Sequence, residues 1–479
     1  MSESPSTGAG DRLPVNRTVL MAVLLSGAFV IILNQTLLNT ALPAFMLDFG
    51  ITASEAQWVT TIFMLVNGIM IPVTAFLIQK FTTRGLFLTA MGLFIAGTLI
   101  CAFAPIYPML LAGRVVQATS GGLIIPLMQT ILFAIFPVHQ RGTAMGTFGL
   151  VISFAPAIGP SLSGWIVDHF PWETLFFMML PIAAIAMVFA YFVLRNVTEQ
   201  THPRLDVLSI ILSSFGFGGL LFGFGGAGDY GWTSASVLVP LAVGTVTLVW
   251  FIFRQLKLEQ PILELRVLKY PMFTLNTLLG MLVFVAMIGG MLIIPMFMQN
   301  MSDFTAMESG LALLPGAVLM GVMSPITGRV FDAVGAKWLA VIGFTLLTVA
   351  TFMLSILTVD TTFFYIAAVN TVRMLGTAMV IMPVTTAALN QLPPRLIPHG
   401  TALNNTMRQI AASVGTAVLV TVMVGTARDP EVYGAAGLVH GANTSFLVAG
   451  IVAFMGIIGA FFIKNSHGPT TRVPRDSIK

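Results

Sequence analysis

Long apolar segments, separated by short polar breaks, run along almost the whole chain. Most are close to or longer than the roughly 20 residues that a helix needs to cross the hydrocarbon core of a membrane. The pattern predicts fourteen spans, at 18–46, 55–79, 84–104, 107–136, 142–167, 172–194, 206–226, 234–254, 271–299, 307–331, 338–358, 362–390, 400–426 and 443–464. We therefore expect an all-α polytopic membrane protein, and the even number of spans places both termini on one side.

The composition supports the membrane class. Hydrophobic residues make up 57% of the 479 residues and charged residues only 8%, against roughly 25% charged residues in soluble domains. The first apolar segment follows Arg12 and Arg17 and is much longer than a signal-peptide core, so we interpret it as a retained span. Cys101 is the single cysteine, which excludes an intrachain disulfide.

The basic residues fix the expected orientation. With a cytoplasmic N-terminus, eighteen of the 22 basic residues fall in cytoplasmic tails and loops. Arg428 falls outside, and Arg114, Arg373 and Arg408 lie within spans. The positive-inside rule therefore predicts that both termini are cytoplasmic. The net charge of +4 is explained by topology, so we expect no nucleic-acid partner.

The chain contains an internal repeat. At an offset of 253 residues, Thr52-Ala53-Ser54-Glu55 aligns with Thr305-Ala306-Met307-Glu308, and at an offset of 258 residues 142–145 align with 400–403. Spans one to six thus resemble spans nine to fourteen, which gives a 6+2+6 arrangement typical of transporters. We expect five regions: a cytoplasmic tail (1–17), a six-helix bundle (18–194), two additional helices with linkers (195–270), a second six-helix bundle (271–466) and a second cytoplasmic tail (467–479).

Four sequence motifs carry a family resemblance. They are a loop with Gly328, Arg329, Asp332, Gly335 and Lys337, an Arg-Val-Val-Gln-Ala-Thr-Ser-Gly stretch from Arg114, the span-five stretch from Ala155 to Gly164, and Asn39-Thr40-Ala41-Leu42-Pro43. Through them the chain resembles, over nearly its whole length, the fourteen-span drug/proton antiporters of the major facilitator superfamily. Within that group it is most similar to the lincomycin-resistance multidrug exporters.

The resemblance implies a major facilitator fold in the bacterial cytoplasmic membrane and the export of small lipophilic, drug-like molecules by alternating access. It also implies a proton gradient as the energy source, no cofactor, and a monomer in the lipid bilayer. Three positions depart from the family pattern. Asn34 and Gln79 stand where aspartates are usual, and Glu173 where an arginine is common.

A proton antiporter needs a group that gains and loses a proton during transport, yet no acidic residue lies deep in a predicted span. Glu308 is our first candidate, because burial is easiest in its apolar segment before Pro315. Asp229, in a Gly-rich turn between spans seven and eight, is the second. The alternative for each is a solvated loop or a helix N-cap carboxylate. The resemblance adds Arg114.

Polar residues inside the spans are candidates for a substrate cavity, since a charge at bilayer depth must face the protein interior and find a partner. Arg114, Gln117 and Gly121 share one helical stripe, and Asn370, Arg373 and Thr377 share another. The cavity candidates are Asn34, Gln35, Asn39, Gln117, Asn276, Arg373, Asn404, Asn405 and Arg408. The alternative is packing, in which the arginines bind backbone carbonyls.

Two further groups are expected to control helix packing and gating. The antiporter motif supplies Gly159 and Gly164, which allow close helix approach, and Pro160, which bends span five. The cytoplasmic gate comprises Gly328, Arg329, Asp332, Gly335, Lys337, Gln79 and Arg84. There, a charge-assisted contact from Asp332 to the neighbouring bundle would hold one access state closed.

Two other functions stay open from the sequence. One is a facilitator for a specific metabolite, lipid or siderophore with the same fold. The other is a membrane enzyme or sensor, which needs a catalytic cluster or an appended soluble domain, and the sequence offers neither. We find no phosphate-binding loop and no metal-type Cys/His spacing, so we expect a secondary active transporter, not an enzyme.

Overall fold

The computed structural model describes residues 17–197, 200–201, 205–464 and 466, and this part of the chain is helical without β-strands. Fourteen of its helices are long and apolar enough to cross a membrane. They are α1 (Arg17–Phe49), α2 (Ala53–Lys80), α3 (Thr83–Ala102), α4 (Tyr107–Ile135), α5 (Arg141–His169), α6 (Thr174–Val193), α7 (Val207–Tyr230), α8 (Ala235–Lys257), α9 (Pro271–Met301), α10 (Ala306–Val334), α11 (Ala336–Met353), α12 (Phe363–Asn390), α13 (Ile397–Thr426) and α15 (Ala435–Phe461).

The number and order of the predicted spans are confirmed, and most boundaries differ by only a few residues. The last span is the exception, since α15 begins at Ala435 and not at 443. Gly434, with a φ of 56°, separates α15 from the short helix α14 (Pro430–Tyr433). The Gly and His residues of this segment interrupt the apolar run. In the fold they pack against α13, where His440 Nδ1 lies 3.2 Å from the carbonyl oxygen of Thr426.

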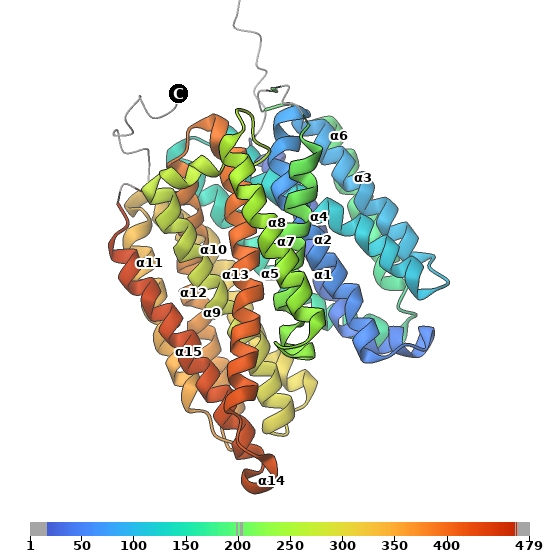
Figure 1. Ribbon diagram of the computed structural model, residues 1–479, viewed down its shortest axis with the longest axis vertical. Helices are drawn as coiled ribbons and strands as arrows, with labels where there is room; N and C mark the ends of the chain where they lie inside the picture. The colour runs from blue at the N-terminus through green and yellow to red at the C-terminus, as the bar shows by residue number, and fades with distance from the viewer. Residues whose placement is uncertain (1–16, 198–199, 202–204, 465, 467–479) are drawn as a thin grey trace, which may run out of the picture.

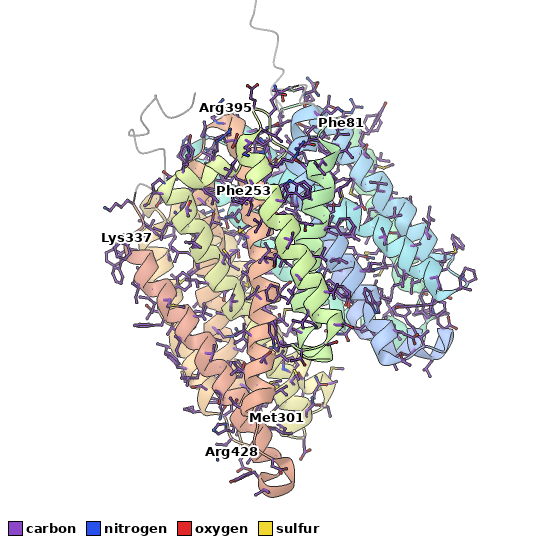
Figure 2. All side chains as sticks on the ribbon, viewed as in Figure 1. Phe81, Phe253, Met301, Lys337, Arg395 and Arg428 are labelled. Carbon is purple, nitrogen blue, oxygen red and sulfur yellow. The ribbon has the colours of Figure 1, made fainter. Side chains whose placement is uncertain are left out.

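The helices form two bundles that meet near one end of the molecule. Figure 1 shows the early and late helices close together at the end where α15 finishes and spread apart toward the end that carries α14. We call the end that carries Arg17 and Ile463 the terminal end, and the opposite end the distal end. Figure 2 places Lys337 and Arg395 toward the terminal end and Arg428 at the distal end.

The internal repeat is visible in the helix starts at the distal end. Glu55 of α2 and Glu308 of α10 each close a capping box, with Thr52 and Thr305 respectively. In both boxes the carboxylate accepts a backbone N–H of the threonine at 2.8 Å. The threonine hydroxyl in turn accepts the glutamate N–H at 3.3 and 3.2 Å. The same sequence signature therefore builds the same helix start twice.

The two additional helices, α7 and α8, form a hairpin that packs on α2 and α13. Their terminal ends are joined by an ion pair, in which Arg254 Nε lies 2.8 Å from Asp206 Oδ2 and Nη2 lies 3.1 Å from Oδ1. Asp206 also caps α7 and accepts the Ser209 hydroxyl at 2.6 Å. The Arg254 guanidinium, followed by the bonds from Ser209, lowers the pKa of the Asp206 carboxyl.

This ion pair predicts a pH-dependent stability. Because the pKa of Asp206 is lower in the folded state than the usual value of about 3.9, its contribution is complete above about pH 4 and disappears as the pH falls through the folded pKa. Asp206→Asn should lower the unfolding temperature of the purified protein by about 1–2 °C at neutral pH, with a smaller difference at pH 3. An equal difference at both pH values would contradict this assignment.

Candidate functional site

The two bundles touch most closely along the terminal halves of α5 and α10. Glycines allow this approach: a Cβ atom built on Gly146 of α5 would lie 3.0 Å from Pro325 Cα and 3.1 Å from Gly328 Cα. Gly142 likewise faces Gly328 and Phe331. A side chain at either of these α5 glycines would overlap α10, so the two helices approach closely and close the terminal end between them.

Asp332, in the last turn of α10, joins this contact to the first turn of α5. Its carboxylate accepts the N–H groups of Gly142 and Thr143 at 2.8 Å each and the Thr143 hydroxyl at 2.6 Å. A carboxylate at a helix N-terminus is stabilised by free N–H groups and by the helix dipole. Asp332 thus makes the expected contact with the other bundle, and it does so at the N-terminus of α5.

The repeat places a second, uncharged contact at the related position. Gln79 of α2 corresponds to Asp332 by the offset of 253, and its amide lies 2.6 Å from His399 Nε2 at the start of α13. His399 is buried, and its Nδ1 accepts the backbone N–H of Glu264 at 3.2 Å. In the neutral ring Nε2 then carries the proton, so Gln79 must present its oxygen.

The other gate candidates lie around these two contacts. The Arg84 guanidinium stacks 4.4 Å from the Tyr191 ring, and Lys337 Nζ lies 5.9 Å from the Trp338 ring. Gly335 ends α10 with a φ of 82°, a conformation that favours glycine. Arg329 is exposed.

At the distal end, the same two helices expose their side chains. Trp165 and Ile158 of α5 are 57% and 39% exposed, and Met307 and Val318 of α10 are 72% and 39% exposed. The glycine contacts join α5 and α10 in their terminal halves, whereas the two bundles spread apart toward the distal end in Figure 1. The structure is closed at the terminal end and open at the distal end.

Arg114 of α4 is completely buried in the first bundle. Its Nη1 donates to Asn34 Oδ1 at 2.7 Å and to Gln117 Oε1 at 2.8 Å, and its Nε donates to the Val59 carbonyl at 3.1 Å. Its guanidinium also lies 4.2 Å from the Phe63 ring. The expected stripe with Gln117 is thus present, and Arg114 ties three helices together through uncharged partners.

Arg373 of α12 is the corresponding residue of the second bundle and is also fully buried. Nε and Nη2 donate to Asn370 Oδ1 at 3.3 and 3.2 Å, and Nη1 donates to the Ala286 carbonyl at 2.9 Å. The guanidinium lies directly against Gly290 of α9, where a Cβ atom would overlap it. Every nitrogen of this guanidinium is engaged by protein, which agrees with a packing role.

Arg408 of α13 belongs to a network that crosses between the bundles. Nη2 donates to Asn405 Oδ1 at 2.8 Å and Nη1 to Thr385 Oγ1 at 3.3 Å, and Phe284 lies 5.0 Å from the guanidinium. Asn405 in turn donates to Gln129 Oε1 of α4 at 2.7 Å. We call Gln129, Thr385, Asn405 and Arg408 the Arg408 network. Asn404 and Asn405 were both cavity candidates from the sequence, and the structure brings Asn405 to Arg408.

The remaining cavity candidates fall into two groups. Asn276 and Asn404 are buried, and within the described residues neither has a partner for its side-chain oxygen. Gln35 is half-buried. Asn39 lies in α1, but its side chain is outside the described part. Asn34 is 1% exposed and bound to Arg114, so it is part of the bundle interior.

The two carboxylates that we expected to carry protons do not lie at the predicted positions. Glu308 is exposed and closes the capping box of α10, so the expected burial is wrong. Burial was predicted from the apolar residues that follow Glu308, but α10 begins at the protein surface. Asp229 lies in the last turn of α7 and not in a turn between helices, and its side chain is outside the described part. Among the described residues, no aspartate or glutamate is buried.

We expect Glu308→Gln to leave transport and any proton flux unchanged within about twofold. Glutamine keeps the oxygen that accepts the Thr305 N–H, and a capping box tolerates it. The measurement is substrate-driven proton flux in vesicles, with Glu55→Gln, the same change in the related capping box, as the matched control. Loss of proton flux in Glu308→Gln alone would restore Glu308 as the proton carrier.

The span-five motif is only partly explained by close packing. Gly159 lies directly against Thr36 of α1, where a Cβ atom would overlap its hydroxyl. Gly164 has nothing within 4 Å of its Cβ position, so the expected close approach does not occur there. Pro160 is exposed in the distal half of α5.

Several residues of these contacts were missed at the sequence level. Gln129, Phe284 and Thr385 lie in apolar stretches without a predicted polar stripe, and their partners come from other helices. His399 was not among the candidates. Its position opposite Gln79 could have been found from the repeat, in which it aligns with Arg141 just before the matched Gly-Thr pairs.

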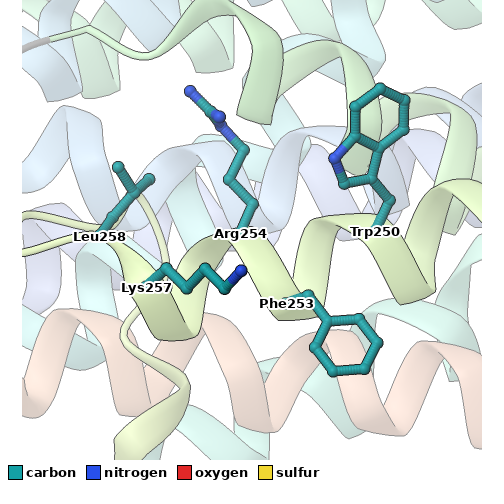
Figure 3. Close-up of a pocket in the computed structure, with 5 residues that line it drawn as sticks. All are labelled: Trp250, Phe253, Arg254, Lys257 and Leu258. Atoms are coloured by element: carbon teal, nitrogen blue, oxygen red, sulfur yellow. The ribbon is translucent and has the colours of Figure 1, made fainter.

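The described residues contain no group of His, Cys, Asp and Glu that could hold a metal ion. A surface pocket of about 280 Å³ lies at the terminal end of α8, lined by Trp250, Phe253, Arg254, Lys257 and Leu258. Figure 3 shows its aromatic and basic side chains along one helix. Trp250 and Phe253 are more than half exposed, so this pocket is on the outer surface and separate from the contact between the bundles.

Comparisons with known proteins agree with this geometry. The model of the Major Facilitator Superfamily matches residues 24–416. The chain is 52% identical to the uncharacterized MFS-type transporter YcnB of Bacillus subtilis, over 97% of this chain and 98% of the relative. It is 45% identical to the lincomycin resistance protein LmrB of the same organism, over 93% and 95%. The proton:xylose symporter XylE shares the fold, with a TM-score of 0.64 at 12% identity over 95% and 97% of the two chains.

Proposed function

This chain belongs to the major facilitator superfamily, and we propose that it exports lipophilic, drug-like molecules from the cytoplasm in exchange for protons. It is a transporter and not an enzyme, and it is a multi-pass protein of the bacterial cytoplasmic membrane. The single observation that carries the proposed drug export is the similarity to the lincomycin resistance protein, which extends over 93% of this chain.

The geometry supports alternating access as the mechanism. The glycine contact of α5 with α10, the Asp332 cap and the Gln79–His399 contact all join the two bundles at one end. None of these contacts is covalent, so all can separate when the bundles rock. The basic loops place the terminal end in the cytoplasm, so the proposed conformation faces outward.

Proton coupling is a more specific part of this proposal. Of the carboxylates predicted from the sequence, Glu308 is exposed, so Asp229 is our candidate for the group that gains and loses the proton. Arg114 stays protonated, and its network with Asn34 and Gln117 is our candidate for coupling proton binding to movement of the first bundle. The chain acts without a cofactor and as a monomer in this proposal.

The test is transport into everted membrane vesicles that contain the protein and hold an imposed proton gradient. Lincomycin, chloramphenicol and rhodamine 123 are added one at a time, and both drug uptake and proton release are recorded. Drug uptake with proton release supports the proposal, and uptake without proton release removes the proton coupling. If no compound moves, drug export is wrong and the alternative of a facilitator for one specific metabolite takes its place.

A further inference from the structure

The buried interior of this transporter is positively charged. Arg114, Arg373 and Arg408 are at most 5% exposed, and no acidic side chain is buried in the part of the chain that the structure describes. The ion pairs of this part, Asp206–Arg254 and Glu264–Arg266, are partly exposed. An arginine stays protonated in proteins. Among the described residues, these three positive charges in the bundle interior are surrounded by neutral groups alone.

The three arginines differ in how fully the protein satisfies them. All three nitrogens of Arg373 donate to Asn370 or Ala286. Arg114 has three hydrogen bonds inside one bundle, with Nη2 left unpaired. Arg408 is the arginine whose network reaches the other bundle, through Asn405 to Gln129. A molecule bound there would touch both halves of the transporter.

The Arg408 network has two unused hydrogen-bond donors. Asn405 accepts from Arg408 through its oxygen, which fixes its amide so that its nitrogen donates to Gln129 Oε1. This leaves Gln129 Nε2 without an acceptor, and Arg408 Nε also has none among the described residues. Both side chains are at least 95% buried. A buried N–H without an acceptor is costly, so this site favours a ligand that brings acceptor atoms.

We infer that the Arg408 network is an anion-recognition site, and that the preferred substrates are lipophilic anions, such as deprotonated weak acids and sulfonates. The inference rests on the proposed export function and specifies its substrate class. The guanidinium and the Gln129 amide supply the donors for the acid group, and the Phe284 ring beside Arg408 supplies an apolar face for the body of the molecule. A permanent cation would meet three like charges and, among the described residues, no buried carboxylate.

This charge preference also suits the direction of transport. The interior of a bacterial cell is electrically negative, so the outward movement of an anion is favoured by the membrane potential. Inward movement of a proton in the same cycle adds a second favourable charge movement. Export of an anion therefore does not need a buried carboxylate to neutralise the substrate.

The test compares two xanthene dyes of opposite charge, fluorescein and rhodamine 123, with neutral chloramphenicol as a third substrate. Uptake into everted vesicles is measured for the whole protein, with vesicles lacking the protein as background. We expect the initial rate for fluorescein to exceed that for rhodamine 123 at least tenfold. Equal or faster transport of rhodamine 123 by the wild type would overturn the inference and leave drug export intact. Transport of none of the three would remove the proposed function itself.

Asn405→Asp gives the sharpest variant. Aspartate has the same shape as asparagine and places a carboxylate against the Arg408 guanidinium. Fluorescein transport should therefore fall at least tenfold, and rhodamine 123 should become the faster of the two dyes. Arg408→Gln should lower fluorescein transport at least tenfold, and by a larger factor than it lowers chloramphenicol transport. Asn196→Asp is the control, because Asn196 is exposed and its oxygen acts as an acceptor for Thr83. An unchanged dye ratio in Asn405→Asp would exclude the Arg408 network as the recognition site.

Discussion

Asp332→Asn should shift the transporter toward the state that is open at its terminal end and slow transport at least tenfold. The carboxylate accepts three hydrogen bonds from the start of α5, and asparagine loses both the charge and one acceptor oxygen. Charge-assisted hydrogen bonds contribute about 1.5–3 kcal/mol, and the helix dipole adds to this. A loss of about 2 kcal/mol changes the ratio of the two states roughly 30-fold.

The shift can be measured as the accessibility of one buried position. Ser324 lies in the α5–α10 contact and is 1% exposed, so Ser324→Cys in a Cys101→Ala background should react slowly with a membrane-impermeant maleimide added to everted vesicles. Adding Asp332→Asn should raise the labelling rate at least tenfold. Asp360→Asn, a change at an exposed distal position, serves as the control. Unchanged labelling would show that Asp332 does not hold the terminal end closed.

Arg114→Gln should have the largest effect, a loss of transport of at least 100-fold. The change leaves the Val59 carbonyl, Asn34 and Gln117 without their common donor. Breaking a buried charged interaction of this kind costs about 3–5 kcal/mol. Arg114→Lys keeps the charge but cannot reach all three acceptors with the same geometry, so we expect an intermediate loss.

Two measurements separate a transport role of Arg114 from a purely structural one. The first is the initial transport rate per molecule of protein in the membrane, and the second is the unfolding temperature of the purified variants. Arg195→Gln, which changes an exposed arginine, is the control. If Arg114→Lys restores stability without restoring proton release, Arg114 takes part in coupling. Transport by Arg114→Gln within tenfold of the wild type would contradict the proposed role.

The sequence predicted most of the fold, because each span is a long apolar run and the bilayer thickness sets its length. The boundary error at α15 arose where Gly434 and His440 interrupt the run and contacts with α13 extend the helix. Stripes within one helix were also predictable, as with Arg114 and Gln117. These depend only on the helical repeat.

Contacts between helices could not be predicted in the same way. The bond from Asn405 to Gln129 and the position of Asp332 at the start of α5 depend on how the bundles meet. The position of Glu308, in contrast, could have been predicted from the sequence. Its Thr-x-x-Glu signature was present in the sequence as a capping box, but the apolar residues that follow made burial the preferred interpretation.

Alternating access from a structure closed at its terminal end predicts opposite changes of distance at the two ends of the α5–α10 pair. Spin labels at Gln140 and Ala333 report the terminal ends of α5 and α10, and labels at Asp168 and Met307 report their distal ends; all four positions are exposed. In a Cys101→Ala background, each pair is measured by electron–electron double resonance with and without substrate and at two pH values. We expect two populations, which differ in that the terminal distance is longer where the distal distance is shorter. Distal and terminal distances that stay constant under all conditions, or that lengthen together, would contradict alternating access.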